Sequence, residues 1–201
     1  MVWLVIVILV ILVMLGSRPE CIESMQSLPN IVLLGDSILN NSNYVSKGHS
    51  VPELLSDKCH LTNLAQDGAT INDCYHQIQT IPQVPPSATF ILSAGGNDLI
   101  ASHSTVAFNS WIRCIQAIKQ KFPLANIAVL TLYQPTNSKY RTKRYTDLIH
   151  KWNHLILTNS SQYHYKVLRA DLALTEPSDF VYDIEPSVTG GKKIADLIKA
   201  V

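Results

Sequence analysis

The chain has 201 residues, of which 47% are hydrophobic and 15% are charged, and its net charge at pH 7 is +1. This length suits one domain with a substantial core, and the composition excludes an intrinsically disordered chain. A net charge so close to zero provides no global field that would attract nucleic acid or an anionic membrane, so we expect no nucleic-acid binding.

The first fifteen residues, MVWLVIVILVILVML, are apolar and carry no charge. The run is shorter than the roughly 20 residues of a membrane span and fits the apolar region of a signal peptide. Against a simple signal, no Lys or Arg precedes the run and no small-x-small cleavage site is obvious at Gly16 and Ser17. We therefore expect residues 1–17 to be an export signal or a short membrane anchor, and the protein to be secreted or membrane-anchored. Residues 18–29 form a connector.

From residue 30 onward, short apolar runs rich in β-branched residues alternate with segments of helical periodicity. The predicted strands are Ile31–Leu34, Leu61–Leu64, Thr89–Ser93, Ile127–Leu132 and Lys166–Ala170. Helical stripes run from Phe108 to Ile118, from Tyr145 to Ile156 and from Ile194 to Val201, and two glycines before the last helix are expected to let the chain turn. This alternation predicts one α/β domain over residues 30–201, a three-layer α/β/α sandwich around a five-stranded parallel sheet in flavodoxin-like order.

Two further sets of side chains lie along these elements. Lys139, Arg141, Lys143 and Arg144 form the one basic cluster, which we interpret as a solvated loop and helix start.

The four cysteines are Cys21, Cys59, Cys74 and Cys114. Their spacing suggests no metal site, and we expect neither a metal nor a cofactor. Cys114 lies on an apolar helical face and is predicted to be a buried thiol. If the chain is exported, Cys59 with Cys74 is the first pair to test for a disulfide.

Several polar or glycine-containing blocks follow the predicted strands, at the sheet edge where ligands bind in such folds. GDS after the first strand places Ser37 at a tight turn, and QDG after the second places Gly68 where a backbone N–H can approach a ligand. GGND after the third strand carries Asn97, whose amide can donate a hydrogen bond to a developing oxyanion. DIEPSVTGG comes after the fifth strand and contains Asp183 and Glu185. Each block alone is an ordinary turn.

Together these blocks, in this order, resemble those of the SGNH/GDSL hydrolase family, and the resemblance covers the chain from about Asn30 to its end. It implies that Ser37 is the nucleophile. It also implies that the Ser37 N–H, the Gly68 N–H and the Asn97 amide form an oxyanion hole.

The last block departs from the family pattern D-x-x-H-P-S, because aligning Pro186 and Ser187 puts Glu185 where histidine belongs. The match is closer to a branch of the family that reads I-E-P-S followed by G-G. Glu185 is thus the expected general base, with burial and the like charge of Asp183 raising its pKa.

Other sources of a base stay open. Asp73 and His76 spell D-x-x-H, but His76 lies about eight residues beyond Gly68, or about 12 Å along a helix. His49 and His103 lie in connections that leave the catalytic edge of the sheet, and His103 is the preferred alternative base.

Two functions remain possible at this stage. The first is a serine ester hydrolase, lipase- or esterase-like, that removes acyl or acetyl groups from a small molecule, lipid or glycan. The second is a catalytically silent protein that holds a carbohydrate or acyl ligand in the same pocket. Ser37 favours the first, and the missing histidine keeps the second open.

Overall fold

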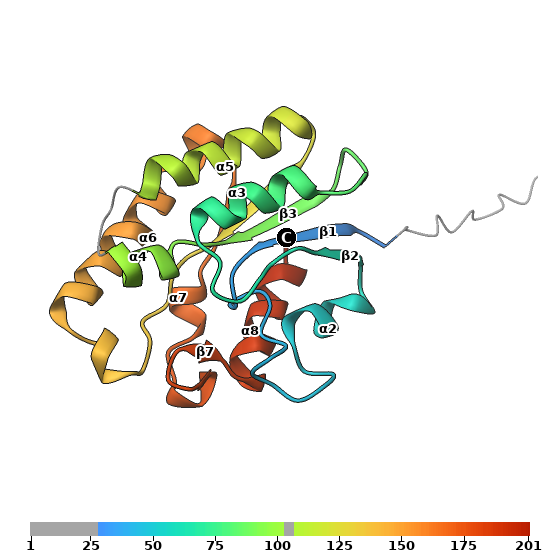
Figure 1. Ribbon diagram of the computed structural model, residues 1–201. Helices are drawn as coiled ribbons and strands as arrows, with labels where there is room; N and C mark the ends of the chain where they lie inside the picture. Colours follow the sequence, from blue (N-terminus) through green and yellow to red (C-terminus); the bar gives the residue numbers. More distant parts are fainter. Residues whose placement is uncertain (1–27, 103–106) are drawn as a thin grey trace, which may run out of the picture.

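The computed structural model describes residues 28–102 and 107–201 of the chain, and it contains one five-stranded sheet flanked by helices (Figure 1). The strands are β1 (Asn30–Gly35), β2 (His60–Asn63), β3 (Thr89–Ser93), β4 (Asn126–Leu130) and β5 (Lys166–Leu168). All neighbouring strands are parallel and their order is β2-β1-β3-β4-β5. The predicted α/β fold and its flavodoxin-like order are therefore confirmed, with β1 and β3 near the centre of the sheet.

Helices cover both faces of the sheet, as right-handed crossovers between parallel strands require. The helices are α2 (Val51–Ser56), α3 (Ile71–Thr80), α4 (Gly96–Ser102), α5 (Ala107–Lys121), α6 (Lys143–Tyr163), α7 (Ala170–Ala173) and α8 (Val188–Lys199), with short 3₁₀ turns η1 (Ser138–Tyr140) and η2 (Pro177–Asp179). Helices α3 and α5 pack together on one face, and α2 and α8 on the other (Figure 1).

Local sequence signals explain where several helices begin. Ser50 and Thr70 form capping boxes with Glu53 and Asp73, and so satisfy the first backbone N–H groups of α2 and α3. The helical stripes predicted from the sequence supply the core, in which Trp111 of α5 and Trp152 of α6 are fully buried with their rings 6.4 Å apart.

The structure corrects the interpretation of the two glycines near the C-terminus. Gly190 and Gly191 do not precede α8 but lie in its first turns. A Cβ atom on Gly190 would lie 2.2 Å from the backbone oxygen of Asp179, and one on Gly191 would lie 2.8 Å from the side-chain nitrogen of Asn41. The glycines thus allow a close approach of α8 to its neighbours, rather than a turn.

A second difference concerns a short ladder outside the main sheet. β6 (Phe180–Val181) pairs antiparallel with β7 (Glu185–Pro186), and this pairing was not predicted. Such two-residue strands give no periodicity signal in a sequence, because alternation needs at least four residues to be seen.

The described cysteines are all free and buried, so the Cys59–Cys74 pairing is not formed. Cys59 donates a hydrogen bond to the backbone oxygen of Leu55. The thiol of Cys74 on α3 hydrogen-bonds to the thiol of Cys114 on α5. Cys114 is a buried thiol, as predicted. The proposed signal or anchor of residues 1–17 and Cys21 lie outside the described residues. Within residues 28–102 and 107–201, no helix is both long and apolar enough to span a membrane.

Candidate active site

The turn that carries Ser37 is built into the centre of the sheet. Gly35 ends β1 with φ of +131°, and a Cβ atom there would lie 1.6 Å from the backbone oxygen of Ser93, so only glycine fits. The buried side-chain amide of Gln77 bonds both the N–H and the carbonyl of Gly35, at 2.7 and 2.9 Å. The Asp36 N–H donates to the Ser93 carbonyl at 3.1 Å. The backbone just before Ser37 is therefore held by β3 and by the Gln77 side chain.

Asp36, the residue before the serine, is a buried carboxyl group. Its Oδ1 accepts hydrogen bonds from the Ile38 N–H at 3.1 Å and from the Ser93 hydroxyl at 3.0 Å. Burial raises the pKa of Asp36 to about 7, against the lowering by these two hydrogen bonds, and the charge of Glu185 raises it further. The carboxyl groups of Asp36 and Glu185 thus interact electrostatically near Ser37.

Glu185 lies opposite the serine turn, on β7. Its carboxylate lies near the Ser37 hydroxyl, and both residues line the same pocket. Partial burial raises the pKa of Glu185, the contact with Ser37 lowers it, and the carboxylate of Asp67 raises it. Asp67 is itself hydrogen-bonded by the Tyr44 hydroxyl.

Glu185 is positioned by contacts that come from three other parts of the chain. It pairs with Val181 in the β6–β7 ladder. The buried hydroxyl of Tyr133, after β4, donates to the carbonyl of Ile184 at 2.8 Å. The buried amide of Asn41, after β1, donates to the carbonyl of Pro186 at 3.1 Å and accepts from the N–H of Val51 at 2.8 Å. The short ladder and two buried side chains together hold the base in place.

Gly68 and Asn97 occupy the second and third blocks. Asn97 lies at the start of α4, lines the pocket with Ser37, and donates one amide hydrogen to the Ala69 carbonyl at 3.0 Å. This bond fixes the amide and ties α4 to the loop after β2. Gly68 lies in that loop with φ of +73° and is exposed, next to Ala69, and it does not line the pocket.

Asp183 is not placed as expected. It is exposed at a left-handed turn with φ of +63°, and its carbonyl accepts from the N–H groups of Thr136 and Asn137 at 2.9 and 3.1 Å. Its contribution is thus a backbone contact that anchors the turn before Glu185. The like charge that raises the pKa of Glu185 comes from Asp67, which the sequence interpretation did not single out.

Among the described residues, no histidine lines the pocket. His49 is exposed and contacts Ser46 and the Lys47 carbonyl, while His76 is exposed on α3, where Asp73 caps the helix instead of orienting an imidazole. His103 lies outside the described residues.

The pocket beside Ser37 is a hollow of about 70 Å³ that opens to solvent. Its aliphatic wall consists of Ile38, Leu99, Ile100, Leu132, Ile149 and Ile184, and three tyrosines, Tyr133, Tyr140 and Tyr145, complete it. Ser37, Asn97, Asp36 and Glu185 add a serine hydroxyl, an amide and two carboxyl groups to this lining. Such a site combines reactive groups with an apolar wall.

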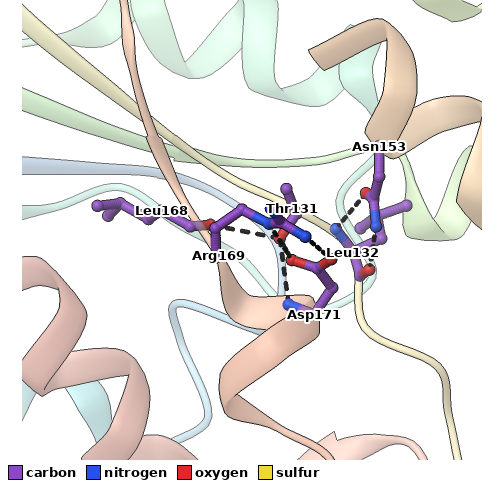
Figure 2. Close-up of polar contacts among 6 residues, drawn as sticks. All are labelled: Thr131, Leu132, Asn153, Leu168, Arg169 and Asp171. Carbon is purple, nitrogen blue, oxygen red and sulfur yellow. Dashed lines mark hydrogen bonds and ion pairs between the residues drawn. The ribbon is translucent and has the colours of Figure 1, made fainter. Parts of the chain in front are cut away.

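The pocket wall after β4 is held by a buried polar cluster (Figure 2). The amide of Asn153 on α6 accepts from the Leu132 N–H at 2.8 Å and donates to the Leu132 carbonyl at 2.7 Å. Beside it, the Thr131 hydroxyl donates to Asp171 at 2.5 Å, and Arg169 binds the same carboxylate through two nitrogens. The segments that follow β4 and β5 are thereby hydrogen-bonded to one another, and the segment after β4 is also bonded to α6.

Sequence reasoning missed the three buried amides Asn41, Gln77 and Asn153. A signal was available for two of them. Gln77 falls at helical spacing on the buried face formed by Ile71, Cys74 and Ile78, and Asn153 directly follows the buried Trp152. A polar side chain on an apolar helical face must find partners, and here the partners are the backbone groups of the site.

Comparisons with known proteins agree with this arrangement. A family model described as the GDSL-like Lipase/Acylhydrolase family matches residues 33–191, while no curated protein matches the chain. The crystal structure of a member of the lipolytic protein G-D-S-L family from Veillonella parvula DSM 2008 is similar, with a TM-score of 0.73 and 17% identity over 86% of this chain and 97% of that chain.

Two further solved structures are similar at comparable levels. An alpha/beta hydrolase enzyme from the metagenome of Lake Arreo, Spain, has a TM-score of 0.64 and 16% identity over 87% of this chain and 94% of that chain. The acetyl xylan esterase AlAXEase has a TM-score of 0.63 and 14% identity over 85% and 98%. Structural likeness at these identities shows the fold, whereas the family model covers most of the sequence. The chain therefore belongs to the GDSL-like lipase/acylhydrolase family.

Proposed function

We propose that this protein is a serine ester hydrolase in which Ser37 is the nucleophile and Glu185 is the general base. The observation that carries the proposal is the proximity of the Ser37 hydroxyl and the Glu185 carboxylate in one pocket with an apolar wall. A nucleophile within reach of a base, beside a hollow for the reacting group, is the arrangement that acyl transfer requires.

In the first half of the reaction, the Ser37 oxygen attacks the acyl carbon while its proton passes to Glu185. The negative charge that develops on the carbonyl oxygen faces the Ser37 N–H and the Asn97 amide, two of the three donors that the family resemblance assigns, whereas the third, Gly68, does not line the pocket. The protonated Glu185 then returns the proton to the departing alcohol as the ester C–O bond breaks. Water, activated by the same carboxylate, releases the acid and restores the serine.

Glutamate is an unusual base for this step, because its ordinary pKa is about 4.3 against about 6.5 for histidine, a deficit of roughly 3 kcal/mol in driving force. Two features of this site reduce the deficit. Partial burial and the Asp67 carboxylate raise the pKa of Glu185. A carboxylate also needs no third residue to select a tautomer, which is consistent with the exposed position of Asp183.

The substrate's acyl group fits the apolar wall better than its alcohol does. Six aliphatic and three tyrosine side chains line the hollow beyond Ser37. Burial of each methylene contributes about 0.8 kcal/mol, so lengthening the acyl chain should improve turnover until the hollow is filled.

A fluorophosphonate probe tests the nucleophile directly, and p-nitrophenyl esters of rising chain length test the reaction. We expect covalent labelling and hydrolysis in the wild type, loss of both in Ser37→Ala, and no change in Ser42→Ala, an exposed serine nearby. A folded wild type that is neither labelled nor active would contradict the proposal and favour the catalytically silent binding protein.

A further inference from the structure

One side of the pocket's mouth is basic. Tyr140 and Tyr145 line the pocket, and their rings meet edge to face at 5.4 Å. The basic cluster singled out in the sequence surrounds them, since all of its members are exposed: Lys139, Arg141, Lys143 and Arg144. The ammonium group of Lys139 lies 5.1 Å from the centre of the Tyr140 ring. This cluster is therefore part of the rim of the candidate active site.

Most of this positive charge is not neutralised within the protein. Lys143 pairs with Asp147 at 2.7 Å, and both side chains are exposed. In the part of the chain that the structure describes, Lys139, Arg141 and Arg144 form no ion pair. The exposed carboxylates of Asp183, on the neighbouring turn, and of Asp67, bonded by Tyr44, offset part of this charge, and three unpaired cations against two carboxylates leave the rim with a net positive charge.

The stability of α6 does not account for these residues. The first turn of a helix favours negative charge, because its free N–H groups carry a partial positive charge. The first turn of α6 contains no acidic residue and begins with Lys143 and Arg144. Local choices that oppose the helix are most often found where a surface has a function.

An exposed aromatic ring lies on the turn before Glu185, which is hydrogen-bonded to the segment that leads to the basic residues. Tyr182 is 74% exposed, and its ring contacts that of Tyr44 edge to face. The two sides of the rim are joined by the bond from the Thr136 N–H to the Asp183 carbonyl, and both lie at the same end of the molecule in Figure 1. Tyrosine, with an apolar ring and a polar tip, suits the level of lipid headgroups.

We propose that this rim, formed by Lys139, Arg141, Arg144 and Tyr182, docks on an anionic lipid surface with the apolar pocket opening toward it. A soluble anion would satisfy the cations but would leave both Tyr182 and the apolar hollow without a partner. A layer of anionic lipid matches all three. The apolar run of residues 1–15 is a further reason to expect the chain near a lipid layer. The docking does not depend on the chemistry of Ser37, so it goes beyond the proposed hydrolysis.

The test is binding of the full chain to vesicles of phosphatidylcholine, with and without phosphatidylglycerol, measured by co-sedimentation. The apolar N-terminal run contributes to both kinds of vesicle, so the ratio of the two partition coefficients isolates the electrostatic part. We expect the wild type to prefer the anionic vesicles, and high salt to remove the preference. Arg141→Gln with Arg144→Gln should reduce the preference by about 30-fold, roughly fivefold for each arginine.

The matched control is Lys58→Gln with Lys166→Gln. It removes two exposed charges at the amino ends of the strands, just before β2 and at the start of β5. This variant should keep the preference. Equal binding to both vesicles, or a preference that survives the arginine changes or falls equally in the control, would overturn the proposal. Hydrolysis of a soluble ester by the wild type is measured separately, so failure of the docking and failure of the ester chemistry are distinguishable.

Discussion

The nucleophile and the base of the candidate site are supported in different ways. Ser37 lies just after β1, a strand with neighbouring strands on both sides. Backbone hydrogen bonds and the Gln77 amide fix the turn that carries it. Glu185 stands on a two-residue ladder outside the main sheet. It is held there by the side chains of Tyr133 and Asn41, which bond the carbonyls on either side of it.

This difference teaches that the two halves of the site should respond differently to substitution. A change at the support of Ser37 disturbs the centre of the sheet, so it should cost stability. A change at the support of Glu185 disturbs a peripheral segment, so it should cost activity first.

The largest effect is expected from Glu185 itself. Glu185→Gln keeps the shape but removes the proton acceptor, so turnover should fall by about 10²–10⁴, the usual contribution of a positioned general base. Ester hydrolysis under saturating substrate measures it, with circular dichroism to check folding. Glu176→Gln, an exposed carboxylate on the same C-terminal segment, is the control and should be silent. Wild-type turnover in Glu185→Gln would move the base elsewhere, and His103→Ala and His49→Ala would then be the next variants.

Asn97 comes next. Its amide is fixed by the Ala69 carbonyl and lines the pocket beside Ser37. Asn97→Ala should lower turnover by about 10²–10³ with little effect on substrate binding, as expected for the loss of an oxyanion donor. Asn72→Ala, exposed on α3, provides the control. Unchanged turnover in Asn97→Ala would remove this residue from the site.

Gln77→Ala tests the support of the nucleophile. It leaves the buried N–H of Gly35 without a partner, while the Gly35 carbonyl keeps the bond from the Gln66 N–H, so the change should cost about 1–3 kcal/mol of unfolding free energy. Urea denaturation measures the change, and Gln79→Ala, exposed on the same helix, should leave stability unaltered. If both variants unfold at the same urea concentration, the contrast between the two supports is wrong.

Tyr133→Phe tests the support of the base. It removes only the hydroxyl that donates to Ile184, so turnover should fall about two- to tenfold, the equivalent of one hydrogen bond. Tyr165→Phe is the matched control, because its buried hydroxyl donates to the Ile156 carbonyl at 2.5 Å, away from the pocket. The two variants should lose similar stability, and only the first should lose turnover. Equal activity in both would show that Glu185 does not need this contact.

The smallest effect is a shift in pH dependence. Glu185 acts as a base only when ionised, so activity should fall as pH drops below its raised pKa. Asp67→Asn removes the like charge that raises this pKa, so the acidic limb should move to lower pH. Asp183→Asn should leave the limb in place, because that side chain is exposed. A shift in Asp183→Asn instead of Asp67→Asn would reverse the two assignments.

How much of this was visible in the sequence depends on the same contrast. The strands around Ser37 alternate with helices of clear periodicity, so the sheet, its order and the blocks at its edge were predictable. β3 was predicted with both of its ends correct, while the ends of β4 and β5 were placed two residues too far along. Beyond these ends, the Thr131 N–H still donates to the Leu168 carbonyl of β5, but Leu132 bonds to the Asn153 side chain and Arg169 is already the N-cap of α7.

The surroundings of Glu185 were less predictable, for a physical reason. Asp67 acts on Glu185 from a loop that is distant in the sequence, and the Tyr133 and Asn41 contacts also join segments far apart in the chain. Assigning the like charge to Asp183 relied on proximity along the chain. That side chain, however, is exposed at a left-handed turn.

The buried carboxyl group of Asp36 couples folding to proton uptake. In the unfolded chain an aspartate ionises near pH 3.9, whereas in the folded protein burial raises its pKa to about 7. Between these values, the folded state binds a proton that the unfolded state does not. The contribution of Asp36 to stability is therefore greatest below about pH 4 and is lost as pH rises toward 7. Carboxylates such as Asp171 and Asp73, whose pKa values are lowered, contribute with the opposite sign. The residue beside the nucleophile thus favours the folded chain in mild acid and makes neutral pH the more demanding condition.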